Sequence, residues 1–244
     1  MRNNLLDIVK NTYGLGIIDK VKVTSTDVST TIESVAEDRS LILHAETNSP
    51  VPQFSGVFGL PNLGKLSTIL NIDEYKENAK ISLTLEDKGG VSVPAGLKFE
   101  NAAGDFKNTY RFMTAEQVNE NLRSIQFKKT PVWIIEFVPS VSSIQRLRFQ
   151  ASANSEQSTF TAKTEGTDLK LFFGDHSNHA GNFIFQTDVT GTITVSCSWP
   201  VSTVISILSL AGDKLFRISS DGILKITVDT GLTTYNYILP SQSK

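Results

Sequence analysis

The sequence has little of the material from which disulfides, metal sites and most catalytic sites are built. It contains one cysteine and three histidines among 244 residues. A single cysteine excludes a disulfide within the chain and is typical of a protein in a reducing compartment. Cys197 lies in a predicted strand, so we expect a small buried residue. No arrangement of nucleophile, base and acid is evident, and we predict no enzyme activity, no metal and no cofactor.

Long apolar runs and an excess of basic charge are absent as well. No apolar stretch approaches the roughly 18 residues that a membrane-spanning helix needs. Asp7 stands where a secretory signal would keep its apolar stretch, so we expect a cytoplasmic protein. The formal net charge is −2, which does not support a nucleic-acid binder with a basic surface all round.

What the sequence does contain is an internal repeat at an offset of 139 residues. Leu60–Leu70 aligns with Trp199–Ser209, and in each stretch an apolar strand runs into a proline that we expect to be the first residue of a short apolar helix. The same offset aligns the helical pattern of residues 2–13 with the one that follows Ser140. Each half is therefore predicted as helix, strands, helix, strands.

Between the helices, short apolar runs separated by turns predict antiparallel strands, as at the Asp-Gly turn of Ser220–Gly222. The predicted class is α+β, with two similar domains that each carry two short helices on one face of antiparallel sheets. We place the domains at residues 1–113 and 140–244. Residues 114–139 match neither half of the repeat, and we interpret them as an interdomain connector.

The charge is divided unevenly between the predicted helices and the rest of the chain. The helices carry one acid, Asp7, against five basic residues, which are Arg2, Lys10, Lys65, Arg146 and Arg148. The helices thus have a net charge of +4, which leaves −6 for everything else, since the whole chain has −2. Contacts to phosphate need charge but no base-edge geometry. Helices that share one surface would therefore bind DNA without reading its sequence.

The connector and the end of the chain hold more apolar side chains than a linker needs. They are Phe127, Trp133 and Phe137 in the connector, and Ile238, Leu239 and Pro240 near the end. Two interpretations remain open. The connector packs onto a sheet, or these residues form a groove for an apolar anchor of a partner peptide.

The closing segments, Ser220–Asp229 and Thr234–Pro240, together with the repeat of two helices per domain, resemble the DNA sliding clamps. The resemblance is to the DNA polymerase processivity factors of tailed bacteriophages, which are related to proliferating cell nuclear antigen (PCNA). It implies a DNA-clamp fold and a closed ring of six similar domains, hence a homotrimer of this two-domain chain. The ring would encircle double-stranded DNA and tether the replicative DNA polymerase, with a clamp loader as a further partner, in the host cytoplasm and without a membrane.

The resemblance also assigns roles to residues by their position. The implied DNA-binding residues are Lys10, Lys65, Arg146 and Arg148, with Lys20 and Lys214 as weaker candidates near turns. The implied pocket for partner peptides consists of Phe127, Trp133, Ile238, Leu239 and Pro240. The helix at Pro200 carries no charge, so it would face DNA through Ser202, Thr203 and Ser206.

Two other classes of function remain as alternatives. A viral virion or tail β-sandwich protein that oligomerises through sheet edges fits the strands rich in Thr and Ser equally well, but it gives no reason to gather basic residues on helices. An enzyme would need a pocket that converges on His44 or His176.

Overall fold

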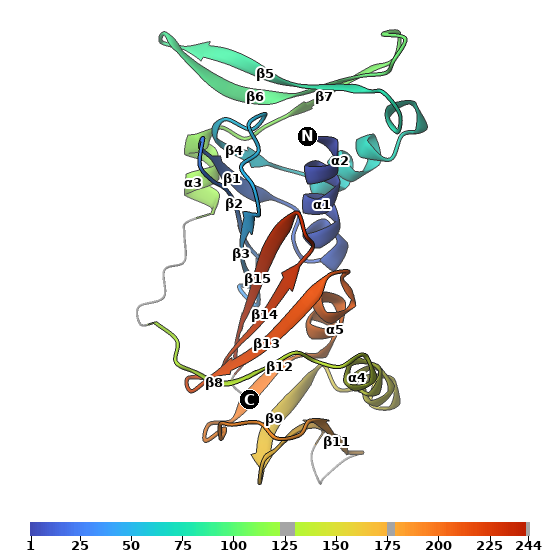
Figure 1. The fold of residues 1–244 in the computed structure, drawn as a ribbon, viewed down its shortest axis with the longest axis vertical. Coiled ribbons are helices and arrows are strands. Elements are labelled where there is room, and N and C mark those ends of the chain that lie inside the picture. The colour runs from blue at the N-terminus through green and yellow to red at the C-terminus, as the bar shows by residue number, and fades with distance from the viewer. Residues whose placement is uncertain (123–129, 175–178, 243–244) are drawn as a thin grey trace. The chain divides into compact units, whose positions relative to one another are not determined.

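A computed structural model describes residues 1–122, 130–174 and 179–242 (Figure 1). The chain divides into two units. The first comprises Met1–Ile125 with Thr230–Tyr235, and the second comprises Gln126–Asp229 with Asn236–Lys244. The last strand therefore contributes its first residues to one unit and its remainder to the other.

The first unit contains two antiparallel sheets. One has the strand order β4-β1-β2-β3, with β1 (Val21–Ser25), β2 (Thr30–Val35), β3 (Ile42–Thr47) and β4 (Gly56–Leu60). The other has the order β5-β6-β7, with β5 (Lys80–Lys88), β6 (Val91–Glu100) and β7 (Lys107–Arg111). Alternate residues of β1 and β2 are buried, as expected for strands with one face on a core.

The helices of the first unit are short and amphipathic. They are α1 (Arg2–Asn11), α2 (Leu63–Leu70) and α3 (Ala115–Asn121), with 3-10 turns at η1 (Tyr13–Leu15) and η2 (Asp73–Tyr75). α1 packs against α2 and buries Leu5, Ile8 and Val9, while α2 buries Leu66 and Leu70 on its inner face.

The second unit repeats this plan. One sheet has the order β11-β10-β9-β12, with β9 (Thr159–Glu165), β10 (Asp168–Phe173), β11 (Gly181–Gln186) and β12 (Cys197–Pro200). The other has the order β15-β14-β13-β8, with β8 (Trp133–Phe137), β13 (Asp213–Ser219), β14 (Ile223–Asp229) and β15 (Thr233–Pro240). The helices are α4 (Val141–Ala153) and α5 (Val201–Ser209), which pack against each other.

The offset seen in the sequence is also an offset between elements of the structure. α1 and α4, β1 and β9, β2 and β10, and α2 and α5 start within one residue of the 139-residue spacing. The sheet order β4-β1-β2-β3 recurs as β12-β9-β10-β11. The prediction of an α+β class with two similar halves is confirmed. Cys197 is fully buried on β12, as predicted, and its burial raises the pKa of the thiol.

The prolines before α2 and α5 lie just outside the helices, so the prediction that they are the first helical residues is wrong. α2 begins at Leu63 because Asn62 is its N-cap, with a φ of 50° and a side-chain oxygen that accepts from the Lys65 N–H at 3.1 Å. A proline side chain cannot provide this bond. Pro200 itself is the N-cap residue of α5.

Residues 114–139, expected to be a connector, contain two regular elements. α3 begins with a capping box in which Thr114 accepts from the Gln117 N–H and its own N–H donates to the Gln117 side chain. β8 pairs with β13 in antiparallel fashion and buries Ile135. Part of the segment thus packs on a sheet, while Phe127 lies outside the described residues. In the described part of the chain, no helix is long and apolar enough to cross a membrane.

Candidate functional site

Lys10 and Lys65 lie on the paired helices α1 and α2, where both side chains are exposed. Arg2 joins the two helices, because its Nη2 donates to the carbonyl of Leu70 at 2.9 Å at the end of α2, where a cation is favoured. Among the described residues, neither lysine forms an ion pair. Both ammonium groups are therefore available to an anion such as a phosphate.

The two arginines of α4 leave the helix on different sides, because residues two apart on an α-helix point about 200° apart. Arg148 donates through Nη2 to Oγ of Ser209 on α5 at 2.7 Å, so it stays with the helix pair. The Arg146 guanidinium lies 5.3 Å from the centroid of the Phe183 ring on β11. The structure does not bring these two predicted DNA-binding residues to one place.

Arg146 belongs to a hollow of about 480 Å³ beside β11. Phe149, Lys170 and Phe183 also line this hollow, and Phe149 on α4 exposes 63% of its surface. Among the described residues, β11 pairs with β10 alone, which leaves its outer edge open. An open strand edge beside an exposed aromatic ring is typical of a surface that pairs with another chain.

The corresponding edge in the first unit is covered by the chain itself. Leu232 accepts through its carbonyl from the N–H of Asn48, directly after β3, at 2.8 Å. Thr234 donates to the Asn48 side chain at 3.2 Å, and the Tyr235 hydroxyl donates to Asp7 of α1 at 2.8 Å. The two halves of the repeat therefore differ in what lies along β3 and along β11.

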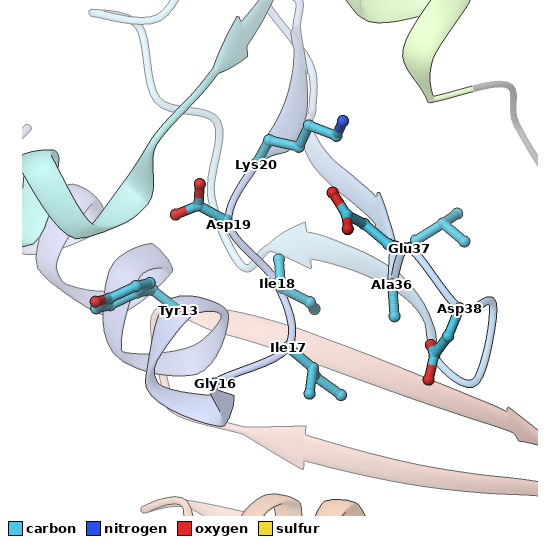
Figure 2. A pocket seen from close by; sticks show the side chains of 10 residues that line it. Tyr13, Gly16, Ile17, Ile18, Asp19, Lys20, Ala36, Glu37 and Asp38 are labelled. Carbon is cyan, nitrogen blue, oxygen red and sulfur yellow. The ribbon is translucent and has the colours of Figure 1, made fainter.

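Lys20 lines a hollow of about 520 Å³ in the first unit together with Asp19, Glu37 and Asp38 (Figure 2). Ser40 donates to the Asp38 carboxylate from both its hydroxyl, at 2.7 Å, and its N–H, at 3.0 Å. These bonds lower the pKa of Asp38, so the carboxylate stays charged at neutral pH. Three acids and only one lysine line this hollow among the residues that the structure describes, which makes it a poor site for phosphate.

Lys214 lies on the strand β13. Its Nζ donates to the carbonyl of Gly212 at 2.9 Å. Burial lowers the pKa of Lys214, and the neighbouring charge of Asp213 partly offsets this effect. On the uncharged helix α5, Ser202 is exposed and Ser206 is half-buried, but Thr203 is buried and cannot contact DNA.

The described residues of the predicted peptide pocket do not converge. Trp133 lies on β8 and Ile238 lies on β15, and these strands are three strand spacings apart in the order β15-β14-β13-β8, or about 14 Å. Leu239 is fully buried, and its carbonyl accepts from the Trp199 indole at 3.1 Å, so its side chain belongs to the core. Pro240 is exposed.

The reasoning from sequence missed two aromatic residues near the edge strand β11. Phe149 lies two positions after Leu147, which is buried, so on a helix it must point away from the core. That spacing was the available signal. Phe183 is buried under Arg146, and no sequence pattern links residues so far apart in the chain.

The histidines named for the enzyme alternative form no common pocket in the described residues. His44 is exposed on β3, with Nδ1 3.8 Å from Oε1 of Glu33. His176 lies outside the described residues. No group of three potential metal ligands occurs in the part of the chain that the structure describes.

Comparison with models of protein families and with curated proteins gave no match. Solved structures do match along the whole chain. PCNA from Thermococcus kodakaraensis aligns with a TM-score of 0.66 at 11% identity, over 99% of this chain and 97% of that one. PCNA of A. fulgidus, in a structure with the C-terminal region of FEN-1 bound, aligns with a TM-score of 0.68 at 10% identity, over 100% and 96%. The duplicated α+β chain therefore has the DNA-clamp fold of the PCNA sliding clamps.

Proposed function

We propose that this protein is a sliding clamp of the bacteriophage type, which encircles duplex DNA and tethers the replicative DNA polymerase. One observation carries the proposal. The clamp fold extends over the whole chain, and exposed basic residues lie on its paired helices. These residues are Lys10, Lys65 and Arg148, which stays with the α4–α5 pair through Ser209. Arg146 and Lys20 instead line other hollows, and Lys214 lies on the strand β13.

The open edge of β11 supports assembly into a ring. Gly59 accepts from the N–H of Met113, just after β7, and Ser198 accepts from the N–H of Gln242, just after β15. Since Gly59 and Ser198 are related by the repeat, β7 is the counterpart of β15. In the first unit, the start of β15 covers the edge of β3. We infer that β7 of a second copy covers β11 in the same way.

Such pairing is head-to-tail, and head-to-tail contacts close into rings when the rotation permits. Each chain supplies two units, so a ring of six units contains three chains. Pairing would also remove the exposed edges of β7 and β11, which in a monomer invite aggregation.

The DNA contact in this proposal is electrostatic and independent of sequence. Lys10, Lys65 and Arg148 would contact phosphates, and Ser202 of α5 would contribute a neutral donor. Encirclement supplies the persistence on DNA, so individual contacts can stay weak and allow sliding. The net charge of −2 is then compatible with DNA binding, because only the helices need to be positive.

The partners in the proposal are double-stranded DNA, the replicative polymerase and a clamp loader, in the host cytoplasm. The ammonium group of Lys225 lies 5.2 Å from the centroid of the Trp133 ring. We propose that Trp133, on the strand β8, helps to bind partner peptides. At the end of β15, Ile238 is half-buried and Pro240 is exposed. Residues 114–139 remain our proposal for the interdomain connector, between domains at 1–113 and 140–244.

The solution mass tests the assembly. Light scattering behind size exclusion, over a concentration series, should give about 80 kDa, three times the chain mass of 26.7 kDa. Purified trimer, loaded onto a nicked circular plasmid, should then stay bound and should dissociate when the plasmid is cut once. A monomer that persists at tens of micromolar, or equal retention on circular and linear DNA, would refute a clamp.

A further inference from the structure

We propose that the outer edge of β5 is a docking site for an extended strand of a partner protein, which adds to the β5-β6-β7 sheet in antiparallel fashion. This site is separate from the helices and from the β7 and β11 edges on which the proposed ring depends. The three strands lie side by side in the first unit, with β5 and β7 at opposite edges (Figure 1).

The repeat identifies β5 as the counterpart of β13. β7 corresponds to β15, so β6 corresponds to β14 and β5 to β13 in the orders β5-β6-β7 and β13-β14-β15. The pairing agrees in detail. Ile81 and Leu83 face Phe99 and Leu97 across β6, as Phe216 and Ile218 face Ile226 and Leu224 across β14.

The counterpart edge in the second unit is covered. β8 pairs with β13, placing Phe137 against Phe216 and Ile135 against Ile218. Phe216 and Ile218 are consequently only 1% and 0% exposed. Their counterparts Ile81 and Leu83 are half-buried, and among the described residues β5 pairs with β6 alone. In the described part of the first unit, the same position in the fold thus lacks one strand.

The edge of β5 is suited to strand addition. It is nine residues long, contains no proline and continues regularly from Lys80 to Thr84, where a bulge interrupts the ladder. An open edge of this kind presents unpaired backbone groups, and a partner strand would gain both hydrogen bonds and burial of the two aliphatic side chains. The regular part accommodates a partner segment of about five residues.

The covering strand in the second unit indicates the chemistry of the occupant. β8 places apolar side chains at alternate positions, Ile135 and Phe137, and between them Glu136 forms an ion pair with Arg217. On β5 the cation is Lys80, which is exposed and has no ion pair with a described residue. From its N-terminus to its C-terminus, an antiparallel partner strand pairs first with Leu83 and last with Lys80. The preferred sequence is therefore apolar, any residue, apolar, acid.

The experiment uses the full-length protein and a fluorescein-labelled peptide with the core isoleucine-threonine-isoleucine-glutamate. Fluorescence anisotropy should show saturable binding, and hydrogen exchange of the complex should show new protection at 80–84. Lys80→Glu should weaken binding roughly two- to fivefold, as a cross-strand ion pair predicts. A peptide with lysine in place of the glutamate should bind the Lys80→Glu variant better than the wild type. The matched control is Lys88→Glu, a charge reversal beyond the bulge at the end of β5, which should leave binding unchanged.

Three results would overturn this proposal without touching the proposed clamp function. The first is that peptide binding does not saturate at millimolar concentration. The second is that protection from hydrogen exchange appears away from β5 and that exchanging the charges of Lys80 and the peptide glutamate does not change binding. The third result is that the protein without peptide already has twice the mass of the ring, and that Lys80→Glu returns it to the mass of a single ring. This would mean that a second copy of the chain occupies the edge of β5.

Discussion

At the scale of single residues, Lys10 and Lys65 are the clearest candidates for contact with DNA, because both are exposed on paired helices and unpaired with any described acid. We predict that Lys10→Glu with Lys65→Glu keeps the proposed trimer and weakens retention on circular DNA. The logarithm of the binding constant should also depend less steeply on that of the salt concentration, by roughly 0.9 for each phosphate that a lysine no longer neutralises.

The matched control has the same change of charge on a strand. Lys80→Glu with Lys88→Glu alters two exposed lysines of β5 and should leave both affinity and salt dependence as in the wild type. Equal weakening in the two double variants would mean that overall charge, and not the helices, determines DNA binding.

The sequence allowed these two lysines to be assigned to helices, because apolar residues at helical spacing define α1 and α2. It did not allow the surroundings of Arg146 to be predicted. That side chain lies over Phe183, which comes from a strand far along the chain, and such a contact depends on tertiary packing. Lys20 is similar, since only the fold brings it to the same hollow as Glu37 and Asp38.

At the scale of elements, the start of α2 depends on Asn62, whose side chain accepts from the Lys65 N–H while its backbone has a φ of 50°. We predict that Asn62→Ala destabilises the protein by about 2 kcal/mol, because the cap bond is removed and alanine is strained in the left-handed region. Asn62→Gly should cost only a few tenths of a kcal/mol, since glycine tolerates this φ.

Urea unfolding followed by circular dichroism measures both changes. If alanine and glycine cost the same, the backbone conformation at Asn62 contributes nothing, and the cap bond alone determines where α2 starts.

Most elements were predictable, because the repeat supplies most helices and strands twice and a weak pattern in one half is supported by its counterpart. α3 has no counterpart, and although Thr114 and Gln117 form a recognisable capping pair, it was not predicted. The pairing of β8 with β13 could not be predicted from the sequence either, since an apolar run does not specify which strand it pairs with.

At the scale of the whole molecule, the proposed ring depends on the outer edge of β11, which no described strand of the chain covers. Phe149 is 63% exposed beside β11, so it contributes little to the stability of a single chain. In the proposed ring it lies next to the strand that a neighbouring copy adds. Loss of a large aromatic side chain from an interface costs about 2 kcal/mol or more where that side chain is a hot spot, so Phe149→Asp should weaken assembly by a factor of about 30 or more while the fold persists.

Gln145→Asp provides the control, because Gln145 is exposed on the same helix and does not line the hollow beside β11. Light scattering at low micromolar concentration should give the monomer mass for Phe149→Asp and the trimer mass for Gln145→Asp. Arg146→Glu should behave as an assembly variant, since its guanidinium lies in the same hollow. If Arg146→Glu instead leaves the trimer intact and reduces only DNA retention, Arg146 faces the DNA and the edge of β11 pairs without it.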